Sequence, residues 1–308
     1  MTKVFIDGSA GTTGLRLRER LAGRDDIELV ILPDSLRKDT EARRSALNDA
    51  DIVFLCLPDD AAREAVSMID NSRTAVIDTS TAHRTADGWT YGFPEIAGAD
   101  KISSSKRIAN PGCHASGFIS LVFPLVKAGI LSPEAKLSAF SLTGYTGGGN
   151  KMIAEYEGER PALYDAPRQY ALGQAHKHLP EMQKVCGLSR APCFCPVVAD
   201  FPCGMEVSIT LFADDIAGSA EDIREVYRSF YKGDLVSFSD TDEGGFLSAG
   251  AFAGLDSMGL SVYGNDERLL LVSRFDNLGK GASGAAIQNM NILLGESETK
   301  GLVLRKEL

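Results

Sequence analysis

The chain has 308 residues, of which 44% are hydrophobic and 24% charged, and its formal net charge is −10. This length can bury a full core and is sufficient for two domains. The negative charge disfavours a nucleic-acid or membrane-surface partner, because both are bound through clustered lysines and arginines. The sequence has no apolar run near the ~20 residues of a membrane span and no signal-peptide pattern, so we expect a cytoplasmic protein.

The first third of the chain alternates short apolar runs with segments of helical spacing. Such alternation predicts a parallel sheet covered by helices on both faces. The predicted strands are residues 3–7, 27–32, 51–58 and 74–80.

After residue 113 the pattern changes to longer alternating strands, as in GMEVSITLFADD and RLLLVSRFDN. This predicts an α+β domain with a mixed or antiparallel sheet. The predicted fold is therefore α/β, with a Rossmann-like dinucleotide domain at 1–112 and a catalytic domain at 113–281. A small-residue helix in the C-terminal segment, 282–308, is predicted to return to the first domain.

Three glycines with the spacing G-x-x-G-x-x-G follow the first predicted strand, in GSAGTTG. Glycine lets the backbone turn tightly and approach a pyrophosphate at a helix N-terminus, so this context predicts a dinucleotide site. A structural glycine turn is the alternative. The residues expected to contact the cofactor here are Gly8, Ala10, Gly11, Thr12, Thr13 and Gly14.

The end of the second predicted strand leaves the choice of cofactor open. Asp34 lies where a carboxylate binds the ribose 2′-hydroxyl of NAD. Ser35, Arg37 and Lys38 follow at once and could hold the 2′-phosphate of NADP, although a solvated loop explains the two cations equally well. We interpret the segment as favouring NADP.

Cys113 lies in NPGCHASGF, between a Pro-Gly pair and small residues that open an apolar segment. This pattern is typical of a helix N-terminus, where unpaired N–H groups and the helix dipole favour a thiolate. Cys113 is therefore either a nucleophile or a buried small residue at a helix start.

The other cysteines are irregularly spaced, which suits a reducing compartment. Most of them fall within residues 186–203 but without C-x-x-C spacing, and Cys193 and Cys195 on a strand would share one face. We expect buried thiols and no metal site.

A nucleophilic thiol needs an acid or base within reach. His114 is adjacent to Cys113, but neighbouring helix positions do not face each other. His176 and His178, in QAHKHLPEM, share a side if that segment is extended, and Pro180 disfavours helical geometry in the residue before it. Spacing does not say which of the two histidines faces the sulfur.

Two further stretches are candidates for ligand contacts. Arg84 follows the fourth predicted strand, at the carboxyl edge where α/β sheets bind ligands, and could pair with a phosphate or carboxylate. GYTGGGN, residues 144–150, is predicted to be a flexible loop whose N–H groups could meet an oxyanion. A surface arginine and a long turn are the alternatives.

Together, GSAGTTG, PGCHASGF, HKHLPEM and LGKGASGAAIQNMN resemble the short form of the N-acetyl-gamma-glutamyl-phosphate reductase family, over essentially the whole chain. The resemblance implies an NADPH-dependent enzyme of arginine biosynthesis that reduces the acyl phosphate N-acetylglutamyl 5-phosphate to the semialdehyde. It implies Cys113 as nucleophile, His178 as acid or base, no metal, and a homodimer or homotetramer. Asn289 is expected at the cofactor site. The residues expected to contact the substrate are Arg84, Asn110, Tyr145 and His176.

Other functions remain open on the residues alone. A dehydrogenase acting on another acyl phosphate is the nearest. A thiol hydrolase or acyltransferase would use Cys113 without a redox step, and a nucleotide-binding protein would leave Cys113 unreactive. The glycine loop argues against the hydrolase.

Overall fold

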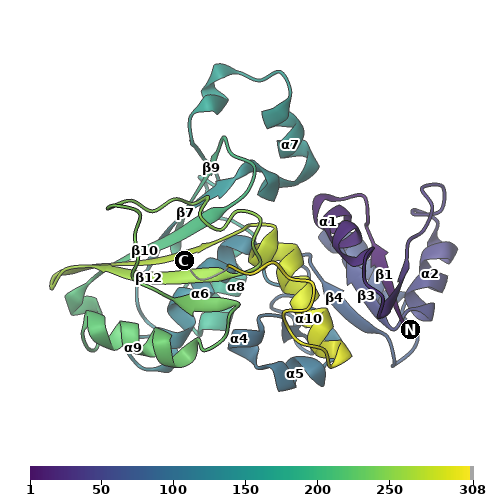
Figure 1. Cartoon of the computed structure of the whole chain (residues 1–308), viewed down its shortest axis with the longest axis horizontal. Helices are drawn as coiled ribbons and strands as arrows, with labels where there is room; N and C mark the ends of the chain where they lie inside the picture. Colours follow the sequence, from purple (N-terminus) through teal and green to yellow (C-terminus); the bar gives the residue numbers. More distant parts are fainter. Residues whose placement is uncertain (306–308) are drawn as a thin grey trace. The chain divides into compact units, whose positions relative to one another are not determined.

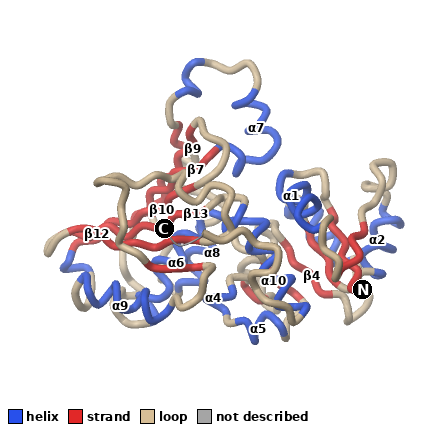
Figure 2. The backbone as a smooth tube through the Cα atoms, in the orientation of Figure 1, coloured by secondary structure: helices blue, strands red, loops and turns tan. Residues whose placement is uncertain are grey.

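The first 111 residues fold together with a segment from near the end of the chain. The computed structural model describes residues 1–305, which divide into two units (Figures 1 and 2). Unit 1 consists of Met1–Pro111 and Ala282–Leu302, and unit 2 of Gly112–Gly281 and the described residues from Val303 onward. Within residues 1–305, no helix is long and apolar enough to cross a membrane.

Unit 1 is built on a sheet in which all neighbouring strands run parallel, in the order β2-β1-β3-β4-β6-β5. This confirms the predicted α/β class and its parallel sheet. The strands are β1 (Thr2–Asp7), β2 (Ile27–Val30), β3 (Ile52–Leu55), β4 (Ala75–Asp78), β5 (Thr90–Tyr91) and β6 (Arg107–Ala109). The helices are α1 (Thr12–Leu21), α2 (Thr40–Asp49), α3 (Asp59–Ser67), α4 (Pro94–Ala97), α5 (Ala99–Ser103) and α10 (Gly284–Leu294).

The sheet of unit 1 buries side chains on both faces, as a parallel sheet between helix layers requires. Every residue of β3 and β4 is buried. One core contains Ala286, Ile287 and Met290 of α10, which packs against α5 (Figure 1). Burying a side chain of this kind contributes about 1.5–3 kcal/mol, so α10 is part of the stability of unit 1.

The C-terminal segment divides between the units. Ala282–Leu302 belongs to unit 1. Val303 instead exchanges hydrogen bonds with Asp256 of unit 2, donating its N–H to Oδ2 at 2.8 Å and accepting from the Asp256 N–H at 2.7 Å. The segment 282–308, which we expected with the first domain, therefore departs from it at Val303, and residues 306–308 lie outside the described residues.

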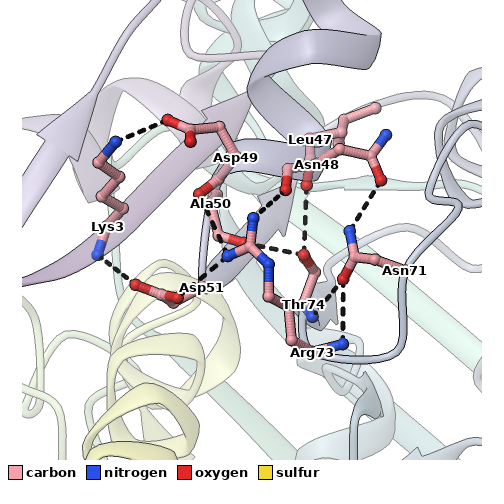
Figure 3. A network of polar contacts seen from close by, with 9 residues as sticks. All are labelled: Lys3, Leu47, Asn48, Asp49, Ala50, Asp51, Asn71, Arg73 and Thr74. Atoms are coloured by element: carbon pink, nitrogen blue, oxygen red, sulfur yellow. Dashed lines mark hydrogen bonds and ion pairs between the residues drawn. The ribbon is translucent and has the colours of Figure 1, made fainter.

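Figure 3 shows a polar network at the amino ends of β1, β3 and β4. Asp51 accepts hydrogen bonds from the Lys3 N–H at 2.9 Å and from Arg73 Nη1 at 3.4 Å. Thr74 Oγ1 donates to the carbonyl of Ala50 at 2.8 Å. These bonds tie neighbouring strands at the edge opposite the glycine turn, so the carboxyl edge is left for ligands.

Unit 2 is built on a mixed sheet, in the order β11-β12-β13-β10-β7-β9-β8, in agreement with the predicted α+β domain. Helix α6 packs against β10 and β13, and Gly117 lets it approach closely, since a Cβ there would lie 2.5 Å from a methyl carbon of Val207. The strands are β7 (Ser138–Gly144), β8 (Arg168–Gln169), β9 (Cys193–Ala199), β10 (Met205–Phe212), β11 (Val236–Phe238), β12 (Met258–Gly264) and β13 (Arg268–Phe275). The helices are α6 (Cys113–Lys127), α7 (Gly149–Glu157), α8 (Leu179–Cys186) and α9 (Ala220–Phe230).

Two local predictions in unit 2 were wrong. Residues 144–150 are not an irregular loop: a 3₁₀ turn, Tyr145–Gly148, leads into α7, which extends away from β7 and β9 (Figure 1). Leu179 is helical despite the following Pro180, because it begins α8, and proline is tolerated in the first turn of a helix.

Candidate active site

A tight glycine turn links β1 to α1. Gly8 has φ +87°, and a Cβ there would lie 2.3 Å from the carbonyl oxygen of Cys56. A Cβ on Gly14 would lie 2.3 Å from the carbonyl oxygen of Gly8, whereas one on Gly11 would lie 3.6 Å from that oxygen, an ordinary van der Waals contact. The packing of unit 1 thus requires glycine at Gly8 and Gly14, whereas a Cβ would fit at Gly11.

The first turn of α1 has the features of an anion site. The helix begins at Thr12 with Gly11 as N-cap, and no side chain caps it. Ala10 is exposed, and Thr12 and Thr13 are half-exposed. This turn follows β1, which lies between β2 and β3 in the sheet. The chain first adds β2 on one side of β1 and then β3 on the other, so the turn lies at the topological switch point where such sheets bind ligands.

A buried ion pair supports this turn. Asp7, the last residue of β1, accepts hydrogen bonds from Nε and Nη2 of Arg43 at 3.1 and 3.0 Å. Burial raises the pKa of Asp7, and the Arg43 guanidinium opposes this. The sequence offered no local signal for a pair that joins β1 to α2.

The turn after β2 carries one carboxylate and two cations. Asp34 Oδ1 lies 3.7 Å from Arg37 Nη1, and its side chain is 96% exposed. Ser35 and Lys38 are also exposed. The turn can therefore offer a carboxylate to a ribose hydroxyl or a guanidinium and an ammonium to a phosphate.

Two asparagines lie inside unit 1. Asn289 Nδ2 donates to the carbonyl of Gly92 at 2.8 Å and to Asn110 Oδ1 at 3.3 Å, and Asn110 Nδ2 donates to the carbonyl of Ala282 at 3.0 Å. Asn289 Oδ1 is buried and accepts no hydrogen bond from the described residues. The amide of Asn110 is thus engaged at both ends, whereas Asn289 keeps an acceptor for a further donor.

Arg84 lies after β4 on a loop that is held by side chains. Its Nε donates to the carbonyl of Asn110 at 3.0 Å and its Nη2 to that of Thr79 at 2.9 Å. The preceding His83 Nδ1 lies 2.6 Å from the buried Asp78 Oδ2. These contacts fix the position of a half-buried guanidinium at the carboxyl edge of the sheet.

Cys113 is the first residue of α6 and is half-exposed, which confirms the predicted helix N-terminus. The N–H of Gly112 donates to Glu181 Oε2 at 3.2 Å, so the first turn of α6 lies beside that of α8. A Cβ on Gly281 would lie 3.0 Å from the Cys113 Cβ, so this glycine leaves room near the thiol.

Two cysteines elsewhere are poor nucleophiles. Burial raises the pKa of Cys56 to about 12 and also raises that of Cys186. A thiol attacks as thiolate, so neither side chain is reactive near neutral pH.

Histidine rings from α6 and from the segment before α8 gather in unit 2. The His114 ring centroid lies 5.5 Å from that of His176 and 5.6 Å from that of His178. The rings of His176 and His178 are perpendicular at 4.7 Å, and the His178 N–H donates to His176 Nδ1 at 3.2 Å. His178 has helical backbone angles, so the segment is not extended there and the condition under which the two histidines would share a side is not met.

His114, which we expected to be a poor acid or base for Cys113, is at the centre of this cluster. Its Nδ1 lies 2.6 Å from Ser141 Oγ and its Nε2 lies 2.7 Å from the hydroxyl of Tyr170. Burial, helped by the positive charges of His176 and Lys177, lowers the pKa of His114 to about 3. The imidazole is therefore neutral at physiological pH.

Tyr145 belongs to a separate aromatic group. Its ring stacks on Tyr156 at 4.9 Å, and its hydroxyl donates to Glu157 Oε1 at 3.3 Å. Arg168 lies over the ring of Tyr164 at 3.3 Å. Tyr170 packs against this group.

The sequence did not identify Ser141 or Glu181 as site residues, and it did not indicate that Tyr170 would be a partner of His114. Ser141 and Tyr170 reach His114 from β7 and from the end of β8, so their proximity depends on strand pairing. Glu181 had a usable signal, because an acid in the first turn of a helix beside a second helix start can accept its N–H groups.

The described residues match two family models. Residues 3–105 match the semialdehyde dehydrogenase NAD binding domain, and residues 113–277 match the semialdehyde dehydrogenase dimerisation domain.

Full-length relatives are more specific. An N-acetyl-gamma-glutamyl-phosphate reductase 2 from Nostoc sp. is 44% identical, with 97% of this chain and 99% of that protein covered. The N-acetyl-gamma-glutamyl-phosphate reductase of Sinorhizobium medicae is 45% identical, with 95% and 98% covered.

Solved structures share the fold at low identity. Aspartate semialdehyde dehydrogenase II from Vibrio cholerae has a TM-score of 0.73 at 16% identity, covering 96% of this chain and 98% of that one. The aspartate semialdehyde dehydrogenase of Francisella tularensis has a TM-score of 0.71 at 13% identity, covering 96% and 100%. The chain belongs to the semialdehyde dehydrogenase family of oxidoreductases and, within it, to the N-acetyl-gamma-glutamyl-phosphate reductases.

Proposed function

We propose that the protein reduces N-acetylglutamyl 5-phosphate with NADPH to N-acetylglutamate 5-semialdehyde and phosphate, in arginine biosynthesis. The observation that carries this proposal is Cys113 at the start of α6, beside α8 and its histidines, in a chain 44% identical to a reductase of that name over almost its whole length. Similarity supports the substrate, and the geometry of unit 2 supports the chemistry.

Cys113 is the nucleophile of the proposed reaction. Its sulfur attacks the acyl carbon, a C–S bond forms, and the C–O bond to phosphate breaks, which leaves a thioester. The start of α6 favours this step, because the positive end of the helix dipole stabilises a thiolate. A thioester accepts hydride more readily than a carboxylate, so the covalent step divides one difficult reduction into two easier ones.

His178 moves the proton. It accepts the proton of the Cys113 thiol as the sulfur attacks and returns it to the sulfur when the reduced adduct collapses to the aldehyde. His178 is 5% exposed, so water competes poorly for this proton. His176, whose Nδ1 accepts the His178 N–H, contacts the substrate and fixes the turn.

The remaining substrate assignments follow from the charge of each side chain and from the hydrogen bonds that it already makes. Arg84 provides a positive charge for the phosphate or carboxylate of the substrate. Asn110 and Tyr145 have their polar atoms engaged within their own units, so we assign them to positioning their neighbours.

The residues of unit 1 fit a nicotinamide dinucleotide. No side chain caps the first turn of α1 at Gly11, and this suits a pyrophosphate. Asn289 Oδ1 is a buried acceptor that suits the carboxamide N–H of nicotinamide. The bound nicotinamide supplies the hydride that reduces the thioester.

NADP rather than NAD is the proposed cofactor. The Arg37 guanidinium lies near the Asp34 carboxylate and partly neutralises it, and with Lys38 and Ser35 it offers donors to a 2′-phosphate. The matched dimerisation domain supports a homodimer or homotetramer.

The direct test runs the reaction backwards. Purified protein is mixed with N-acetylglutamate 5-semialdehyde, phosphate and either NADP or NAD, and absorbance of the reduced nicotinamide is followed. We expect absorbance to increase with NADP, and only when phosphate is present. An increase with NAD alone would assign Asp34 to the ribose hydroxyl. Reaction of other semialdehydes but not this one would contradict the proposed substrate.

A further inference from the structure

The loop that follows β4 is folded around one carboxylate. Asp78, the last residue of β4, is fully buried, and its Oδ1 accepts the N–H of Ser80 at 2.9 Å. Its Oδ2 accepts the Ser80 hydroxyl at 2.7 Å and lies 2.6 Å from His83 Nδ1. The Ser80 hydroxyl also accepts the N–H of Ala82 at 3.1 Å. The side chain of Asp78 therefore fixes the path of the chain as far as His83.

The ring of His83 is held at its edge and on one face. A carboxylate oxygen only accepts hydrogen bonds, so Nδ1 carries the proton of the bond to Asp78. The face of the ring stacks on Trp89, with the ring centroids 4.0 Å apart and the planes at 11°. Trp89 in turn packs against the core of unit 1 that contains Val76 of β4. The orientation of His83 is thus fixed both by the end of a strand and by the core.

Arg84, the next residue, returns to the start of the same loop. Its Nη2 donates at 2.9 Å to the carbonyl of Thr79, the first residue after β4. Its Nε donates at 3.0 Å to the carbonyl of Asn110, the first residue after β6. Arg84 is therefore constrained at its backbone through His83 and at its guanidinium through two carbonyl groups.

The constraint on Arg84 bears on ligand binding, because a side chain that is fixed beforehand loses little rotamer freedom when a ligand arrives. Arg84 lies at the carboxyl edge of the sheet, and a guanidinium binds the paired oxygens of a phosphate or carboxylate. We propose that His83, held by Asp78 and Trp89, is a positioning residue that presents Arg84 to an anionic group of the substrate. The inference rests on the proposed function in one respect, that Arg84 contacts the substrate.

A role of His83 in stability alone gives a different result. If His83 only closed the loop, its replacement would lower the free energy of unfolding and leave the affinity for the substrate unchanged. If it positions Arg84, the affinity for one anionic group falls, whereas the affinity for the cofactor and the rate of hydride transfer do not. The test therefore separates KM from kcat.

The first measurement uses the reverse reaction of the full-length protein with N-acetylglutamate 5-semialdehyde, phosphate and NADP. His83→Phe keeps a ring for Trp89 but cannot donate to Asp78. In this variant we expect KM for either phosphate or the semialdehyde to rise about tenfold, because the guanidinium is no longer fixed before binding. The KM for NADP and kcat should change less than about twofold.

Arg84→Lys identifies the anionic group. Lysine keeps the positive charge but loses the planar pair of donors, so this variant should raise KM for the same reactant at least as much as His83→Phe does. A rise for phosphate assigns Arg84 to the phosphoryl group, and a rise for the semialdehyde assigns it to the carboxylate. If the two variants raise KM for different reactants, His83 does not act through Arg84.

A pair of Trp89 variants tests the stack. Trp89→Phe keeps an aromatic face for His83, whereas Trp89→Leu does not. We expect Trp89→Leu to raise the same KM about fivefold and Trp89→Phe to raise it less than about twofold. This pair also decides the question if His83→Phe does not fold, as judged by urea unfolding. Equal KM values in the two variants would oppose the proposal.

Thr74→Val is the matched control. Thr74 is fully buried directly before β4, and its Oγ1 donates to the carbonyl of Ala50 at 2.8 Å. This variant therefore removes a buried hydrogen bond at the opposite end of the strand that Asp78 ends. Its KM values should equal those of the unaltered protein. A rise as large as in His83→Phe would show that any loss of stability in unit 1 weakens binding, and would overturn the proposal.

A second measurement needs no turnover. Trp89 is the only tryptophan of the chain, so the emission of the protein reports on the residue that stacks on His83. Inorganic phosphate and N-acetylglutamate are added separately to the full-length protein. We expect a saturable change in emission with one of them, with half-saturation at an about tenfold higher concentration in His83→Phe. No change with either anion, or equal half-saturation in the two proteins, would overturn the proposal.

The failures are distinguishable. Normal activity with unchanged KM values in folded His83→Phe would reject the role of His83 and leave the reductase intact. The expected shift in half-saturation, in a protein that fails the reductase assay, would support the role of His83 and reject the substrate.

Discussion

Cys113 and His114 are neighbours on α6 but have different surroundings. Cys113 is half-exposed at the helix start, whereas His114 is 3% exposed and bonded at both ring nitrogens. One position is accessible to a substrate, and the other orders the side chains around it. This separation has measurable consequences for each residue.

Replacing Cys113 should remove chemistry and spare cofactor binding. Cys113→Ser is expected to lower the reductase rate at least a thousandfold, because a serine hydroxyl is not ionised at neutral pH. Binding of NADPH, measured by fluorescence titration, should change less than twofold. Near-full activity would reject the thioester mechanism. Cys193→Ser, at an exposed cysteine of β9, is the matched control.

His114 should make stability depend on pH. Its pKa is about 3 in the folded protein and about 6.5 when unfolded, so the unfolded chain binds the extra proton between these values. The stability that the neutral ring contributes is complete above about pH 6.5 and falls as pH decreases, by about 1.4 kcal/mol for each unit.

Urea unfolding at pH 6 and pH 5 measures this effect. The free energy of unfolding falls between pH 6 and pH 5. This fall should be smaller by about 1 kcal/mol in His114→Gln than in the unaltered protein. Equal losses would mean that the ring takes up its proton without unfolding.

Sequence reasoning identified residues whose role is local. The helix start at Cys113 was readable from Pro-Gly and small residues, and the structure confirms it. The place of His114 was not readable, because neighbouring side chains on a helix diverge and its partners come from two strands. Tertiary pairing, not spacing, brings Ser141 and Tyr170 to it.

At the scale of elements, the glycines of the turn between β1 and α1 have different roles, one in packing and another in ligand binding. Gly14→Ala forces a Cβ to within 2.3 Å of a backbone oxygen and should destabilise the protein by about 3 kcal/mol in urea unfolding. Gly11 has an ordinary φ, and a Cβ there makes only ordinary contacts, the nearest at 3.6 Å, so Gly11→Ala should change stability by less than about 0.5 kcal/mol.

Gly11→Ala should nevertheless weaken NADPH binding about tenfold, because its methyl group occupies the space proposed for the pyrophosphate. Unchanged affinity in this variant would move the cofactor away from the turn.

The turn after β2 should set the choice of cofactor. Replacing Arg37 and Lys38 together by serine is expected to lower kcat/KM for NADPH at least tenfold while leaving NADH nearly unchanged. Arg63→Ser, at another exposed arginine of unit 1, is the control. A parallel loss with both cofactors would contradict a 2′-phosphate contact.

Elements with a strong hydrophobic periodicity could be predicted from the sequence, whereas the segment that leads into α7 could not. The alternation of strands and helices correctly indicated the parallel sheet of unit 1. GYTGGGN reads as a loop because glycine disfavours helix formation, yet α7 begins within it, where the stacked rings of Tyr145 and Tyr156 stabilise the segment. Packing here overrides local propensity.

At the scale of the whole molecule, unit 1 is discontinuous in sequence. Its core includes Ile287 and Met290 of α10, and Arg24 Nη1 donates to Asn291 Oδ1 at 2.9 Å. A fragment of residues 1–111 should therefore lack cooperative urea unfolding, because one core is left open. Residues 1–111 joined by a flexible linker to 282–302 should unfold cooperatively. Cooperative unfolding of the shorter fragment would show that α10 is dispensable.

The late position of α10 also bears on synthesis. A ribosome adds roughly 5–20 residues each second, so roughly 10–30 s pass between the emergence of residue 111 and that of α10. During that interval the nascent chain displays the apolar face that Ile287 and Met290 later cover, while unit 2 is already being completed from a nearly continuous stretch. The amino-terminal part of this protein is consequently the last to mature, and it is the part for which a chaperone would matter most during translation.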